Sequence, residues 1–177
     1  MRHALEEAET GRGGVVAVTG EAGIGKTRLP QEVAEAAAAR GCAVHAGRCW
    51  EEGGAPAYWP WIQVVRSAGG DFTEIAAASS RALPDQADPE GLRFGLFDAV
   101  TRFLLDRADQ KAQLVVLEDL HAADEASLLL LRFLGRRSRM RRLRCCARIA
   151  TASRAFASSR PSLPVFCGSG DGSRFAA

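Results

Sequence analysis

The sequence has no hydrophobic run long enough to cross a bilayer and no secretory signal at its start. A membrane helix needs about 20 consecutive apolar residues, and no stretch of this 177-residue chain approaches that length. The segment from Met1 to Glu7 becomes acidic at once and has no apolar centre, unlike a signal peptide. We therefore expect a cytoplasmic protein without a membrane partner.

Paired metal-binding cysteines are also missing. The chain has five cysteines but no C-x-x-C pair, and no cysteine is spaced from one of the three histidines as in a zinc site. We expect reduced thiols, some of them in the core. The five are Cys42, Cys49, Cys145, Cys146 and Cys167.

What the chain does have is a phosphate-loop pattern, G-x-x-x-x-G-K-T, directly after the apolar run Val15–Val18. A strand, a glycine-rich loop and a helix in this order place backbone N–H groups and a helix N-terminus around phosphate oxygens. The lysine would bind the β- and γ-phosphates and take part in catalysis, and the threonine hydroxyl would bind Mg²⁺. The octet is Gly20-Glu21-Ala22-Gly23-Ile24-Gly25-Lys26-Thr27. We predict that it binds ATP with Mg²⁺.

Strand-like and helix-like segments alternate along the rest of the chain. Short apolar runs predict strands, while apolar residues at a 3.6-residue period and an N-capping Asp124 predict helices. This alternation is typical of an α/β fold, here a P-loop NTPase with a parallel sheet flanked by helices. The expected strands are 15–19, 42–46 and 114–117, and the expected helices are 25–40, 58–66, 72–83, 92–108 and the segment after 124. A polar connector is expected at 84–91.

Two acids follow the apolar run Leu114–Leu117, and these are Glu118 and Asp119. The carboxyl ends of parallel strands form the active edge of such a sheet. We expect Glu118 to hold Mg²⁺ together with Thr27, and Asp119 to prepare the attacking water. The two acids could exchange these roles, and a solvated loop start is the alternative interpretation. His121 either contacts the Mg²⁺ region or makes a structural hydrogen bond to the backbone.

Four motifs together resemble the ATPase module of the large LuxR-type bacterial transcriptional regulators. These regulators are signal-transduction ATPases with numerous domains (STAND), a branch of the AAA+-like P-loop proteins. The motifs cover residues from about 4 to 135 and lie in segments 20–29, 47–51, 55–61 and 117–124. The resemblance implies an ATP-hydrolysing regulatory switch whose DNA contact is made by a helix-turn-helix domain outside this chain. A homo-oligomer or an effector protein is a further partner that the resemblance allows.

The chain departs from this family at two positions and in its last quarter. Ala122 stands where tryptophan is common, and the usual Gly-Arg-Glu segment is not found before residue 4. In the family a buried strand follows from about residue 138 and ends in a γ-phosphate-sensing arginine. Here the sequence continues instead with an arginine-rich stretch that includes Cys145–Ile149.

The charge changes abruptly at the same place. Residues 1–135 carry 13 basic and 20 acidic side chains, whereas residues 136–177 carry ten arginines and one acid. We therefore divide the chain into a partial P-loop ATP-binding domain, 1–135, and an arginine-rich tail, 136–177, that is disordered or read out of frame. The sheet would then lack a central strand and be incomplete on its C-terminal side, unless Cys145–Ile149 filled that gap.

Two other function classes remain open at this stage. A small-molecule P-loop kinase would share the phosphate loop but needs an acceptor pocket and a lid. A non-enzymic nucleic-acid binder would use the arginines of 136–177 to contact phosphates. The absence of lysine and of interleaved aromatic residues from the arginine-rich stretch argues against the second class.

Overall fold

The structure is a computed structural model that describes residues 14–20, 28–82, 84, 88–138, 143–150 and 165–167. A five-stranded, all-parallel sheet runs through these residues in the order β2-β3-β4-β1-β5. The strands are β1 (Gly14–Gly20), β2 (Ala43–Arg48), β3 (Gln113–Glu118), β4 (Leu143–Ala150) and β5 (Val165–Cys167). The predicted P-loop NTPase class with a parallel sheet is confirmed.

Strand β4 occupies the centre of the sheet, between β1 and β3. It pairs with β1 from Gly14 opposite Arg144 to Gly20 opposite Ala150, and with β3 from Gln113 opposite Leu143. The sheet therefore extends past residue 135, and the central strand is present. Of the two possibilities left by the sequence, the stretch containing Cys145–Ile149 fills the gap. Because arginines interrupt its apolar residues, the sequence did not predict this strand, which pairs with a neighbouring strand on each side.

Helical segments of the described chain connect these strands. They are α2 (Arg28–Ala39), α3 (Trp59–Ser67), α4 (Phe72–Arg81), α5 (Pro89–Gln110), the short 3₁₀ helix η1 (Leu120–Ala122) and α6 (Glu125–Arg137). Helix α5 begins three residues before the predicted start at 92, because the Asp88 side chain accepts a hydrogen bond from Gly91 N–H and Pro89 suits a first helical position. The predicted cap Asp124 likewise accepts from Ser127 N–H. None of the described helices combines the length and apolar character of a bilayer span.

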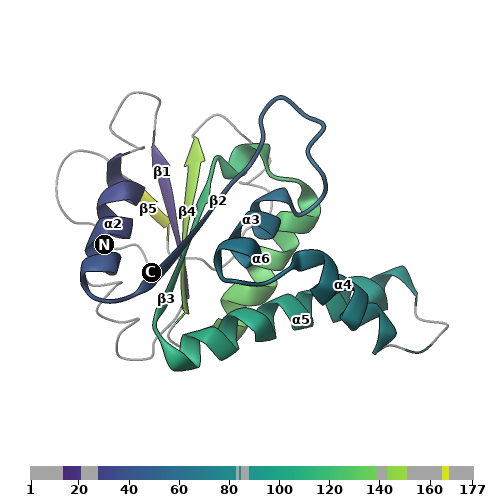
Figure 1. Cartoon of the computed structure of the whole chain (residues 1–177). Helices are drawn as coiled ribbons and strands as arrows, with labels where there is room; N and C mark the ends of the chain where they lie inside the picture. The colour runs from purple at the N-terminus through teal and green to yellow at the C-terminus, as the bar shows by residue number, and fades with distance from the viewer. Residues whose placement is uncertain are drawn as a thin grey trace.

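The helices cover the two faces of the sheet unequally, with α2 on one side and α3, α5 and α6 on the other (Figure 1). Strand β3 shows why, because successive side chains of a strand point to opposite faces. Val115 and Leu117 join the core below α3, α5 and α6, whereas Leu114 and Val116 pack with α2. All four are almost completely buried, so β3 reads as a continuous apolar run.

Candidate functional site

The carboxyl ends of β1 and β3 lie at the same edge of the sheet. Ala17 of β1 and Leu117 of β3 both lie opposite Ala147 of β4. Asp119 is the second residue after Leu117 and Gly20 is the third after Ala17. Two strand spacings separate β1 from β3, which is about 10 Å. The acids and the start of the phosphate loop thus face one crevice, as expected for a ligand site at the carboxyl end of a parallel sheet.

Asp119 occupies an unusual backbone position at this edge. Its φ of 57° and ψ of 40° are left-handed, a conformation that aspartate tolerates better than most residues. Its carbonyl oxygen accepts a hydrogen bond from Ala122 N–H, so the chain turns directly from β3 into η1. The residue is only 5% exposed, and its Oδ2 accepts a hydrogen bond from Arg48 Nε at 2.9 Å. The turn therefore presents one carboxylate at the end of the strand, held by a guanidinium from β2.

Glu118 is the last residue of β3 and is partly buried. It lies opposite Arg48 in the β2–β3 register, and its carbonyl oxygen accepts from Cys49 N–H at 3.0 Å. This backbone bond continues the pairing one residue beyond β2. The predicted acid pair is thus at the predicted edge, while its roles toward metal and water remain predictions.

A second polar contact joins the loop after β2 to η1. His121 Nε2 lies 3.0 Å from Glu51 Oε1, and His121 Nδ1 is buried without a hydrogen-bond partner among the described residues. One ligand atom from each of Glu51, Asp119 and His121 lies within 4.8 Å of the others. Imidazole with carboxylates suits zinc, manganese or iron, whereas Mg²⁺ prefers oxygen ligands alone. The polar contact of His121 thus goes to a side chain, and the predicted hydrogen bond to the backbone is not among its contacts with the described residues.

Cys49 lies beside these acids. Burial, followed by the negative charges of Asp124 and Asp119, raises the pKa of its thiol to about 12. A raised pKa favours the protonated thiol over the nucleophilic thiolate. Cys49 therefore lines the site as a buried residue, as expected for a core thiol.

The loop 49–59 and the segment after β3 form one surface. Tyr58 N–H donates to Asp124 Oδ2 at 3.3 Å, and Trp61 Nε1–H donates to the Ser127 carbonyl at 3.0 Å. A small cavity of about 170 Å³ lies between them, lined by Trp50, Trp59 and Ala122 among others. The alanine at 122, where the resembled family has tryptophan, leaves this space open.

The sequence analysis missed two residues of this edge, Arg48 and Glu51, as candidate site residues. Only the adjacency of β2 and β3 brings them to Asp119 and His121, and that adjacency was not deduced from the sequence. Gly20 is the last residue of β1. The other predicted phosphate-loop residues, Glu21, Ala22, Gly23, Ile24, Gly25, Lys26 and Thr27, lie outside the described residues.

Comparison with solved structures finds distant similarities. The cytoplasmic domain of the Thermomonospora curvata Type VII secretion ATPase EccC is 16% identical over 90% of this chain and 20% of that chain, with a TM-score of 0.47. C. elegans PCH-2 is 13% identical over 93% of this chain and 40% of that chain, with a TM-score of 0.44. A second EccC structure, of ATPases 2 and 3 with a signal sequence peptide, is 13% identical over 88% of this chain and 30% of that chain, with a TM-score of 0.44. The chain thus spans a fifth to two fifths of the solved chains that it matches here.

No curated protein is similar enough in sequence to count as a match. The model of the AAA ATPase domain, in contrast, matches residues 1–146. That range includes the phosphate-loop motif, the acid pair and the beginning of β4. The chain therefore belongs to the AAA ATPase domain family, and its P-loop module binds ATP.

Proposed function

We propose that this chain is the ATP·Mg²⁺-binding module of a signal-transduction ATPase of the kind found in LuxR-type transcriptional regulators. The observation that carries the proposal is the common edge of β1 and β3, where one strand leads into G-x-x-x-x-G-K-T and the other ends in Glu118-Asp119. In this proposal Lys26 and the loop backbone hold the phosphates, Thr27 and Glu118 hold Mg²⁺, and Asp119 orients and deprotonates the attacking water.

The regulator assignment is supported by how the motif segments meet. Segments 47–51, 55–61 and 117–124 are three of the four that carried the resemblance. They pack into one surface through Cys49 N–H to the Glu118 carbonyl and Tyr58 N–H to Asp124 Oδ2. A loop linked to the acid pair in this way can respond when bound nucleotide changes. The signal would then pass to effector domains outside this chain.

The Arg48–Asp119 pair suggests a brake on hydrolysis in this proposal. A carboxylate oxygen that accepts a hydrogen bond from a guanidinium is turned toward that partner and away from a water in the crevice. The side chain of Arg48 is 69% exposed and that of Asp119 is 8% exposed. The guanidinium therefore contacts the buried carboxylate from the solvent side. Water activation requires Asp119 to turn from Arg48 toward the crevice.

The test is ATP affinity, measured by calorimetry with and without Mg²⁺. Lys26→Ala should weaken ATP binding at least about tenfold, because it removes a charge-assisted contact to phosphate. Lys111→Ala is the matched control, since Lys111 is the other lysine of the chain and is exposed at the end of α5. Equal ATP affinity for the wild type and for Lys26→Ala would contradict the proposal.

The roles of the two acids are separated by Glu118→Gln and Asp119→Asn. Glu118→Gln should remove most of the Mg²⁺ dependence of ATP affinity, while Asp119→Asn should keep that affinity and abolish phosphate release. The reverse pattern would exchange the two roles. Transfer of label from ATP to a metabolite instead of water would indicate the kinase alternative.

A further inference from the structure

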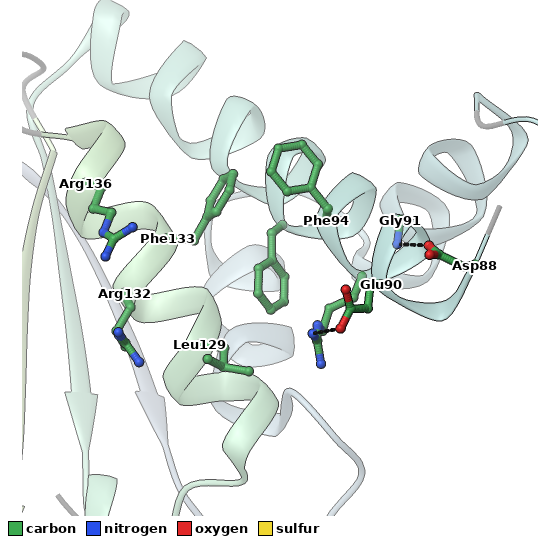
Figure 2. Close-up of a pocket in the computed structure, with 10 residues that line it drawn as sticks. Asp88, Glu90, Gly91, Phe94, Leu129, Arg132, Phe133 and Arg136 are labelled. Atoms are coloured by element: carbon green, nitrogen blue, oxygen red, sulfur yellow. Dashed lines mark hydrogen bonds and ion pairs between the residues drawn. The ribbon is translucent and has the colours of Figure 1, made fainter. Parts of the chain in front are cut away.

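A second cavity lies between the first turns of α5 and the middle and end of α6. It has a volume of about 680 Å³, within the range of roughly 300–1,000 Å³ that is usual for small-molecule sites. Figure 2 shows Phe94 of α5 and Phe133 of α6 meeting between the two helices, with Leu129 one turn away on α6. We call this cavity the α5–α6 groove.

The apolar lining of the α5–α6 groove is built from three phenylalanines. The Phe94 and Phe133 rings are 5.4 Å apart and nearly perpendicular, and the Phe97 and Phe133 rings are 5.8 Å apart. Phe97 is buried, whereas Phe94 is 56% exposed. The Phe94 ring is therefore the part of this aromatic cluster that a ligand can reach from solvent.

The charges of the groove leave a positive excess. Asp88 accepts from Gly91 N–H at 2.7 Å as the cap of α5, and Glu90 pairs with Arg93 at 4.0 Å. Arg132 and Arg136 also line the groove, and no ion pair or hydrogen bond to either is found within the described part of the chain. Three arginines and two acids give the lining one net positive charge.

Arg137, the next arginine on α6, does have partners among the described residues. Arg137 pairs with Asp98 at 3.5 Å and lies over the Phe133 ring at 5.2 Å. Arg132 and Arg136, one helical turn apart on α6, also line the groove, and Figure 2 draws them on the other side of α6 from Phe94 and Leu129. Side chains at i and i+4 are neighbours on one helix face, so together they can hold a single carboxylate, sulfonate or phosphate group.

We propose that the α5–α6 groove binds a small amphiphilic anion, with an apolar body against the three phenylalanines and one anionic group at Arg132 and Arg136. The single net charge of the lining favours a monoanion. An acidic peptide carries several negative charges, and the carboxylates of Asp88 and Glu90 in the groove lining would repel them. This site lies beyond the proposed ATP function and does not depend on it.

The test uses 8-anilinonaphthalene-1-sulfonate, an aromatic body with one sulfonate, whose fluorescence rises when it binds. The wild type should bind the probe saturably at one site, and dodecanoate should displace it better than dodecanol. Arg132→Ala/Arg136→Ala should weaken probe affinity at least about tenfold, the loss expected when charge-assisted hydrogen bonds are removed. Arg81→Ala, an exposed arginine at the end of α4, should leave it unchanged.

Two further variants keep the result interpretable. Phe94→Ala should weaken the probe by removing the exposed ring, and Arg132→Glu/Arg136→Glu should reverse the preference from dodecanoate to dodecyltrimethylammonium. Circular dichroism checks that each variant is folded. Unchanged probe affinity in the folded double-alanine variant overturns the proposal. Displacement of the probe by ATP·Mg²⁺, or a wild-type dimer that the Phe94→Ala change dissociates, overturns it as well.

Discussion

Among the side chains that the structure describes, the two faces of the sheet show very different amounts of apolar packing. Under α3, α5 and α6, fifteen buried residues of the described chain form one cluster. Under α2, four described residues form the other, and these are Val33, Ala37, Leu114 and Val116. We call them the large cluster and the small cluster. Figure 1 shows α2 on one side of the sheet and α3, α5 and α6 on the other.

This difference separates the two halves of the ATP site. The acid half is anchored in the large cluster, because Leu120 follows directly after Asp119 and is 2% exposed within it. The phosphate half leads into α2, which rests on the small cluster. Since buried apolar area provides most of the stabilisation of a helix in a protein, the packing of the large cluster should hold the acid edge firmly.

The largest expected effect compares two neighbouring valines of β3. Val115→Ala should lower the free energy of unfolding by about 3 kcal/mol, and Val116→Ala by about half as much. The same two methyl groups are removed from side chains that are 0% and 4% exposed. Among the described side chains, more apolar neighbours surround Val115 than Val116, so the cavity at Val115 should collapse less. Urea denaturation measures both, and equal losses would contradict the contrast between the faces.

The next effect concerns the place where α3 meets β2. A Cβ atom on Gly47 would lie 2.2 Å from the Pro60 carbonyl oxygen, which belongs to the backbone and can move only with α3. Gly47→Ala should therefore cost roughly 1–3 kcal/mol of stability through overpacking. It should also disturb the neighbouring Arg48–Asp119 pair.

The control for this change is Ala46→Ser, on the adjacent and exposed position of β2. It should alter the thermal midpoint of unfolding by little. A Gly47→Ala variant with wild-type stability would show that α3 lies farther from β2 than the structure has it.

The sequence was sufficient to predict the class of fold and the acid edge because both depend on local patterns. A continuous apolar run ending in acids predicted β3, and the single aspartate Asp124 predicted the cap of α6, whereas the Asp88 cap of α5 was missed. Asp119 needed no long-range knowledge, since it follows its strand directly. The helices around Trp61 and Phe97 were also visible from composition and periodicity.

The sequence was insufficient wherever strand adjacency decided the outcome. The pairing of β4 between β1 and β3 overrides the arginine content of residues 143–150, which locally resembles a tail. Arg48 and Glu51 reach the acid edge only because β2 lies next to β3. The groove between α5 and α6 depends on tertiary packing of two helices that are separate in the sequence. In each case a nonlocal contact outweighs local propensity.

A smaller effect is expected at Asp124, which connects the large cluster to the acid edge. Its carboxylate accepts from Ser127 N–H at 2.9 Å, from Ser127 Oγ–H at 2.6 Å and from Tyr58 N–H at 3.3 Å. Asp124→Ala should cost about 1–2 kcal/mol, the usual loss for an N-cap with additional partners. Asp124→Asn, which retains one acceptor oxygen, should cost less. Asp88→Ala removes a cap with one described bond and should also cost less in the same thermal denaturation series.

The smallest effect is expected at Arg48, where the exposed end of β2 holds the buried carboxylate of Asp119. An ion pair with one exposed partner is worth about 0.2–1 kcal/mol, so removing the charge can change a rate by up to about fivefold. Because our proposed function treats the pair as a brake, Arg48→Gln should raise ATP turnover within that limit and leave ATP affinity unchanged. Steady-state phosphate release measures the first quantity and calorimetry the second.

The sign of the Arg48→Gln effect distinguishes two views of the acid edge. A higher turnover means that the firmly held acid half must be released before it acts, and the rise should vanish in Arg48→Gln/Asp119→Asn because the base is gone. A lower turnover means that the guanidinium holds Asp119 in its working position, which contradicts the brake. Arg66→Gln, an exposed arginine at the end of α3, controls for a general effect of lost positive charge. Since the pair lies at the end of β2 and away from α2, neither result should alter the stability contrast between Val115→Ala and Val116→Ala.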